Sequence, residues 1–189
     1  MRRKQKSSTG ANLTRNQWIA IGVTGVAILT AIIVTIVFIV LHFRFSLPPT
    51  PLEIHEFETR VFELTNVERV NAGLNPLIWD DTLAYAARGH SVDLQYGRIE
   101  RGHVGSDGST VGQRIQRAGI TNASMWSENV ARGQTTPEQV VRAWMDSPGH
   151  RANILRAEST HLGVGFIQGG PGHGSDFNTA WTQKFIRLS

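Results

Sequence analysis

Two histidines and one glutamate of this sequence have residue types and surroundings that suit a chemical site. His103 lies in RGHVGSDGS, where the neighbouring glycines leave a loop free to direct the imidazole into a cleft. His150 follows Ser147-Pro148-Gly149, at which we expect a helix to stop, so its ring can turn inward. Glu128 in WSENV is expected at the start of a short strand, close to Trp126, and a carboxylate near an aromatic ring is often half-buried and needs a partner. These three residues are therefore the first candidates for a functional cleft.

The spacing of these candidates does not by itself define a chemistry. His103 and His150 lack the i, i+4 spacing of a helical zinc motif, and the sequence has no G-x-S-x-G nucleophile elbow. Ser147 lies close to His150 but has no convincing orienting group. His90 falls on the apolar face of a predicted helix, so we expect a core histidine there. Three other histidines are weaker candidates: His55 is expected to be solvated, His161 precedes a strand and is ambiguous, and His173, in a glycine-rich loop, carries little weight.

The elements that must position these residues are predicted from hydrophobic periodicity and from capping residues. Four helices are expected, at about 53–72, 81–97, 110–118 and 137–146. Asp80 or Asp81 can cap the second helix, and Pro137 suits the first turn of the fourth. Two late strands are expected, at Leu162–Ile167 and Asn178–Ile186. Helices followed by strands predict an α+β fold in which helices pack on a small sheet.

A long apolar segment precedes this region. From Trp18 to Phe43 no acidic residue, lysine or arginine interrupts the sequence. A helix of roughly 24 residues rises about 36 Å, enough to cross a hydrocarbon core of about 30 Å. The segment is longer than the core of a signal peptide, has no small-residue cleavage site behind it, and lacks the polar face of a buried helix. We therefore expect a basic tail at 1–17, a transmembrane helix at 18–43 and a proline-rich spacer at 44–52.

The flanking charges predict the orientation of this helix. Five lysines and arginines precede it, and cytoplasmic flanks carry the excess of these residues. We therefore expect a single-pass protein of the cell membrane, with a cytoplasmic N-terminus and an extracytoplasmic domain at 53–189.

The charge distribution argues against nucleic-acid binding. The chain carries a formal charge of +4, but residues beyond 45 hold 13 of the 19 basic residues and all 15 acidic ones. The net charge of that region is therefore −2, and it shows no basic stripe with interleaved aromatic residues. The sequence has no cysteine, which excludes disulfides, cysteine–zinc sites and thiol nucleophiles. The domain must be held together by its core.

Six segments of the region 53–189 occur in a characteristic order. They are LTNVERVNAGLNPLIWDDTLAYAARGHSVDL, GHVGSDGSTVGQRIQRAG, SENV, VVRAWMDSPGHRANIL, HLGVGF and WTQKF. Together they resemble a bacterial-type CAP domain, of the superfamily of cysteine-rich secretory proteins, antigen 5 and pathogenesis-related 1 proteins, also called SCP-like. The resemblance implies a three-layer α-β-α sandwich with a central cleft. In this superfamily two histidines and two acidic residues line the cleft, and in several members the histidine pair binds zinc.

Matching the segments assigns residues of this chain to that cleft. His103 and His150 match the two histidines, which are the expected metal ligands, and Glu128 matches the glutamate of a G-E-N element. The second acidic position falls near Asp146, the nearest carboxylate, although Ser147 is an equally close match in register.

Three further features qualify this assignment. Asp107 is another candidate for the second acidic position, because it follows the first cleft histidine closely. Gly102 stands where the superfamily usually has a hydroxyl residue, and Ser127 replaces the glycine of G-E-N. The disulfides of eukaryotic members are absent, which only removes a covalent staple.

The resemblance favours binding over catalysis. Two neutral imidazoles with waters, and one carboxylate, would make an open zinc site whose affinity falls as the pH drops through about 6.5. We expect a non-catalytic, membrane-anchored binding module for an extracellular lipid, peptide or cell-wall component. The alternative is a zinc-dependent hydrolase of peptides or cell-wall material, although the sequence has no H-E-x-x-H motif. In a third hypothesis the cleft is irrelevant and the domain surface is a protein-interaction platform.

Overall fold

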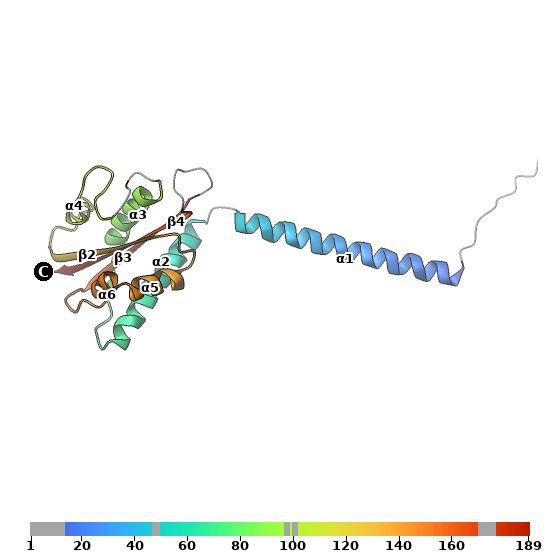
Figure 1. Cartoon of the computed structure of the whole chain (residues 1–189), viewed down its shortest axis with the longest axis horizontal. Helices are drawn as coiled ribbons and strands as arrows, with labels where there is room; N and C mark the ends of the chain where they lie inside the picture. Colours follow the sequence, from blue (N-terminus) through green and yellow to red (C-terminus); the bar gives the residue numbers. More distant parts are fainter. Residues whose placement is uncertain (1–13, 47–49, 97–98, 100–101, 170–176) are drawn as a thin grey trace, which may run out of the picture. The chain divides into compact units, whose positions relative to one another are not determined.

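The chain divides into two compact units, Met1–Leu47 and Pro48–Ser189 (Figure 1). The computed structural model describes residues 14–46, 50–96, 99, 102–169 and 177–189, without the side chains of 17–25, 40–46 and 51. Parts of the predicted tail 1–17 and spacer 44–52 lie outside the described residues, as does His173.

The described part of the first unit is one helix, α1 (Arg15–Ser46), of 32 residues. It contains the whole of the apolar segment 18–43, and its described side chains between Val26 and Ile39 are all exposed. Within the part of the chain that the structure describes, no helix is both long enough and apolar enough to cross a membrane. The transmembrane helix therefore stays a prediction.

The second unit combines five helices with a four-stranded sheet among its described residues. Its helices are α2 (Pro51–Asn71), α3 (Asp81–Gln95), α4 (Val111–Arg117), α5 (Pro137–Asp146) and α6 (Pro148–Ile154). Its strands are β1 (Ile78–Trp79), β2 (Ala123–Arg132), β3 (His161–Gln168) and β4 (Thr179–Leu188). The strand order is β1-β3-β4-β2, with β1 parallel to β3 and the other two pairs antiparallel. The predicted α+β fold is confirmed.

Helices cover both faces of this sheet. Helices α3 and α4 lie on one face, and α2, α5 and α6 lie on the other (Figure 1). The larger apolar core lies on the second face, where Trp144 of α5 packs with Phe166 and Trp181 of the sheet. On the first face α3 approaches β3 so closely that Cβ atoms on Gly163 and Gly165 would lie 2.3 Å from its backbone. Two glycines of the HLGVGF segment therefore set the spacing between helix and sheet.

The capping residues explain where the helices begin. Asp80 accepts a hydrogen bond from the Leu83 N–H and is the N-cap of α3, one of the two expected positions. Thr110 and Gln113 form a capping box at the start of α4. Thr136 caps α5, with Pro137 in its first turn as expected.

Three local predictions differ from the structure. Ser147-Pro148-Gly149 was expected to be a break, but Pro148 begins the short helix α6, which contains His150. A proline ends a preceding helix and also suits the first turn of a new one, so both effects act at the same place. Glu128 was expected near the start of a short strand and instead lies inside a ten-residue strand, β2. Strand β1, of two residues, was not predicted.

Two fully buried charged residues hold the elements together. The Arg69 guanidinium donates hydrogen bonds to four main-chain carbonyls, those of Asn75, Ile154, Arg156 and Ser159. The Glu58 carboxylate accepts from the Arg88 Nε at 2.8 Å and from the Phe166 N–H at 3.1 Å, joining α2, α3 and β3. These contacts give the two residues structural roles.

Candidate functional site

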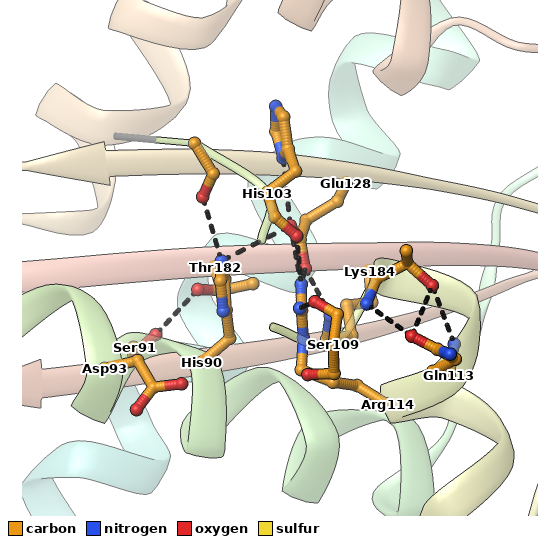
Figure 2. A network of polar contacts seen from close by, with 12 residues as sticks. His90, Ser91, Asp93, His103, Ser109, Gln113, Arg114, Glu128, Thr182 and Lys184 are labelled. Atoms are coloured by element: carbon orange, nitrogen blue, oxygen red, sulfur yellow. Dashed lines mark hydrogen bonds and ion pairs between the residues drawn. The ribbon is translucent and has the colours of Figure 1, made fainter. Parts of the chain in front are cut away.

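The centre of the candidate site is the Glu128 carboxylate on β2. Its side chain is 1% exposed and lies on the sheet face covered by α3 and α4, where four cationic or imidazole groups approach it (Figure 2). His103 Nδ1 lies 2.9 Å from Oε1, and Arg114 Nη2 of α4 lies 3.1 Å from Oε2. The Lys184 ammonium, on the directly opposite residue of β4, contacts the same Oε2.

His90 is the fourth group that approaches this carboxylate. Its Nε2 lies 3.5 Å from Glu128 Oε1 and 3.1 Å from the Gly102 carbonyl. Because that carbonyl can only accept, Nε2 carries the proton, and the buried Nδ1 has no hydrogen-bond partner among the described residues. The predicted burial of His90 is correct. Its contact with the carboxylate was missed, since helical periodicity reports only which face is buried.

The tautomer of His103 follows from its partner. An ionised carboxylate accepts hydrogen bonds but does not donate them, so Nδ1 carries the proton, and in the neutral form of the ring Nε2 keeps its lone pair. The imidazole is half exposed. His103 therefore offers Nε2 to a ligand while Glu128 holds the ring in place.

Burial and neighbouring charges shift the pKa values of Glu128, Lys184 and His90. Burial alone would raise the pKa of Glu128, but the hydrogen bond from His103 and the charge of Lys184 lower it to about 2. Burial, opposed by the Glu128 charge, lowers the pKa of Lys184 to about 8. The same pair of causes lowers the pKa of His90 to about 4, so this ring is neutral at pH 7. At neutral pH one carboxylate is therefore held between two cations and two imidazoles.

His150 approaches the same stretch of β2 from α6. Its main-chain carbonyl accepts a hydrogen bond from the Asn129 amide at 3.1 Å, and Asn129 directly follows Glu128. The Asn153 amide, also on α6, donates to the Glu128 carbonyl at 3.2 Å. Burial and the neighbouring His103 charge both lower the pKa of His150. The structure thus brings His103 and Glu128 into contact and places His150 within electrostatic range of His103.

The two other acidic candidates do not contact Glu128. Asp107 is exposed, pairs with Arg117 and accepts the Ser109 N–H at 2.9 Å. The hydrogen bonds from Ser109 and the pairing with Arg117 hold the pKa of Asp107 well below its usual range. Asp146 is the exposed last residue of α5, and among the described residues nothing bonds it to His103 or Glu128. Among the described residues neither carboxylate contacts Glu128 or His103, and Asp107 is linked to Arg114 only through Ser109, whose carbonyl accepts from Arg114.

A pocket of about 310 Å³ opens beside His103 and Glu128. Val104, Val111 and Trp126 supply most of its apolar wall. Across the residues that the structure describes, no group of three or more histidine, aspartate, glutamate or cysteine side chains could hold a metal ion.

Sequence reasoning missed two cations of this site. Lys184 lies in AWTQKFI, an otherwise uncharged segment, and a lysine in a buried strand needs a counter-charge, so a signal was present. Arg114 gave no such signal, because an arginine on a short amphipathic helix is usually exposed. Its long-range pairing depends on where α4 packs.

Comparison with known proteins places the fold and the site in context. Residues 62–185 match the cysteine-rich secretory protein family, also called CAP. The uncharacterised Bacillus subtilis protein YkwD is 40% identical over 139 residues, which are 72% of this chain and 49% of YkwD. The uncharacterised membrane protein YlbC of the same organism is 35% identical over 108 residues, covering 57% of this chain and 31% of YlbC.

This chain is also similar to a solved structure. An extracellular protein of Bacillus anthracis that contains an SCP domain superposes with a TM-score of 0.62 and 32% identity. The match covers 75% of this chain and 45% of that chain. This chain spans half or less of the length of each of these relatives.

Proposed function

Because this chain belongs to the cysteine-rich secretory protein family, we propose that it is a membrane-tethered, extracytoplasmic binding protein. Its cleft holds a divalent cation, with zinc as the best fit, between His103 and His150. The cation and the cleft around it bind an extracellular ligand without chemical turnover.

The observation that carries this proposal is the hydrogen bond from His103 Nδ1 to Glu128. Histidines that bind metals commonly donate their other ring N–H to a carboxylate, which fixes the ring and raises its basicity. Glu128 supplies that carboxylate at 2.9 Å, and the half-exposed ring leaves Nε2 available. We take His150 as the second ligand, because it matches the second histidine of the family's cleft and its main-chain carbonyl bonds to Asn129, the residue after Glu128. Bound zinc supplies an open, Lewis-acidic centre that attracts ligand oxygens.

The same geometry disfavours hydrolysis. An effective general base has a pKa near the working pH. The pKa of Glu128 is about 2 and its oxygens are engaged by His103, Arg114 and Lys184, so it is a poor proton acceptor. We therefore prefer the binding module to the zinc-dependent hydrolase.

The tether rests on α1 and on the charges around it. Its 32 helical residues include the uncharged segment 18–43, and five basic residues precede that segment. The hydroxyls of Thr30 and Thr35 donate to carbonyls one turn earlier, as membrane helices require of their polar groups. One relative is named a membrane protein and another an extracellular protein, which fits this arrangement.

Isothermal titration of the full chain with zinc, in mild detergent, tests the cation site. We expect His103→Ala/His150→Ala to lose binding and His55→Ala, at an exposed histidine outside the cleft, to retain it. Glu128→Gln should weaken zinc binding about 10–100-fold, because an amide orients the His103 ring less firmly than the carboxylate does. Equal zinc affinity in the double variant and the parent chain would remove the cation from the proposal.

A further inference from the structure

The outer strand of the sheet, β2, has an edge that pairs with no other strand among the described residues. In an antiparallel pair, alternate residues either bond across the pair or direct both main-chain groups away from it. The carbonyls of Glu128 and Val130 point outward, since they accept from the Asn153 amide and the Trp144 indole, each at 3.2 Å. By the same alternation Trp126 directs its N–H and C=O outward.

Three consecutive main-chain groups of this edge have no partner within the described ranges. They are the N–H and C=O of Trp126 and the N–H of Glu128. Trp126 is 44% exposed. Glu128 is 4% exposed as a residue but only 1% in its side chain, so its small exposed area lies mainly on the main chain. An unpaired strand edge of this kind is a template for another extended chain.

We propose that an extended peptide binds in the cleft as an additional antiparallel strand on β2. This inference rests on the function proposed above and names the ligand class of the same cleft. A peptide residue opposite Trp126 exchanges two hydrogen bonds with it, and the peptide residue two positions earlier accepts from the Glu128 N–H. A peptide main chain presents this alternation of donor and acceptor at strand spacing, whereas a lipid or a glycan does not.

The pocket of about 310 Å³ gives the bound peptide a site for one side chain. Directly opposite residues of an antiparallel pair place their side chains on the same face. The peptide residue opposite Trp126 therefore directs its side chain toward the pocket, whose walls include Val104 and Val111. These walls are apolar and the Glu128 charge is already paired, which favours an uncharged side chain of the size of leucine or phenylalanine.

One of the two proposed cation ligands lies beside the stretch of β2 that the peptide uses. His103 lines the pocket, and the His150 carbonyl accepts from the side chain of Asn129, the next residue of the strand. Peptide binding and cation binding can be measured by separate means.

The test uses the full chain in mild detergent and fluorescein-labelled, end-blocked peptides of sequence KTVXVTK, where X is glycine, leucine or phenylalanine. Fluorescence anisotropy reports binding. We expect the leucine and phenylalanine peptides to bind about tenfold more tightly than the glycine peptide. Methylation of the amide nitrogen of X, which faces β2, should weaken binding about tenfold. Methylation of the next amide, which faces away, should change the affinity less than about threefold.

A protein variant tests the pocket. Val104→Asp should abolish the preference for leucine over glycine, whereas Val67→Asp, at an equally exposed valine on α2, should leave it unchanged.

Equal binding of the two methylated peptides, or no binding by any peptide, would overturn the inference. A zinc titration of the same samples separates the two proposals. Zinc binding without peptide binding overturns only the peptide site, and peptide binding without zinc binding overturns only the cation site.

Discussion

Glu128 makes it possible to bury two cations beside an imidazole. An unpaired ammonium or guanidinium in this interior would lose its hydration without compensation, at a cost of several kcal/mol. Arg114 and Lys184 share one carboxylate, and Arg114 also donates to the carbonyls of His103 and Ser109. The network therefore fixes the loop that carries His103, so the stability of the domain and the geometry of its cleft depend on the same contacts.

His90 should make the domain sensitive to acid. Between pH 6.5 and about 4 the unfolded imidazole binds a proton that the folded ring, facing Glu128, Arg114 and Lys184, does not. Unfolding then takes up a proton, so stability is complete above about pH 6.5 and falls toward pH 4. The loss should be on the order of 3 kcal/mol. Urea unfolding at pH 7.5, 5.5 and 4.5 measures it.

Two variants isolate the contribution of this ring. His90→Gln cannot titrate, so its stability should change less across the same pH range, although the variant is less stable at pH 7.5. His55→Gln, which alters an exposed histidine, should follow the parent chain. A parent chain with the same stability at pH 7.5 and 4.5 would contradict the role of His90.

At the scale of residues, the sequence predicted the candidates that lie in recognisable segments. His103 and Glu128 were identified in this way, and the structure places them in contact. Arg114 and Lys184 were missed, since their meeting depends on the packing of α4 and on the β2–β4 register. Asp107 was proposed because it follows His103 closely in the chain, and Asp146 because it is the carboxylate nearest to the family's second acidic position. Neither argument says where a carboxylate points in the folded domain.

At the scale of elements, the stability of the domain depends on the close packing of α3 on β3. A Cβ on Gly163 or Gly165 would lie 2.3 Å from backbone atoms of the helix, which cannot move aside as a side chain can. Gly163→Ala and Gly165→Ala should each destabilise the domain by about 3 kcal/mol or more, the upper end of overpacking effects. Urea unfolding of the full chain measures the change.

A glycine of the opposite helix surface is the matched control. Gly89 lies inside α3, and a Cβ there would meet nothing within 4 Å. Gly89→Ala should therefore stabilise the domain, by up to about 1 kcal/mol, through helix propensity alone. If all three substitutions had similar effects, the close approach of helix and sheet would not be the cause.

The same elements show how far sequence patterns reach. The bounds of α5 agree with the predicted range of about 137–146, because Pro137 marks the first turn of the helix. Short elements were missed: β1 has two residues, and α6 has seven and begins at a proline. Neither is long enough to show a period of its own, and both depend on neighbours. Strand β1 pairs with β3, and Asn153 of α6 bonds to β2.

The whole chain separates its charges between two regions. Before residue 18 it has five basic residues and no acidic one, whereas all acidic residues lie beyond position 50. The overall charge of +4 therefore describes neither region, and the globular unit is slightly acidic. The predicted orientation depends on the basic flank, since acidic residues of a domain contribute little to membrane topology.

The tether can be tested at two central positions of α1. Val34 and Val37 are exposed on the helix, and each lysine near the centre of a membrane helix costs about 2.5–3.5 kcal/mol. Val34→Lys/Val37→Lys should move the chain from the carbonate-resistant membrane pellet of a bacterial host to the soluble fraction, whereas Val34→Leu/Val37→Leu should remain in the pellet. Protease added outside intact spheroplasts should digest the domain of the parent chain and spare an epitope placed before residue 15. Recovery of the parent chain in the carbonate supernatant would refute the anchor, and protection of its domain would reverse the orientation.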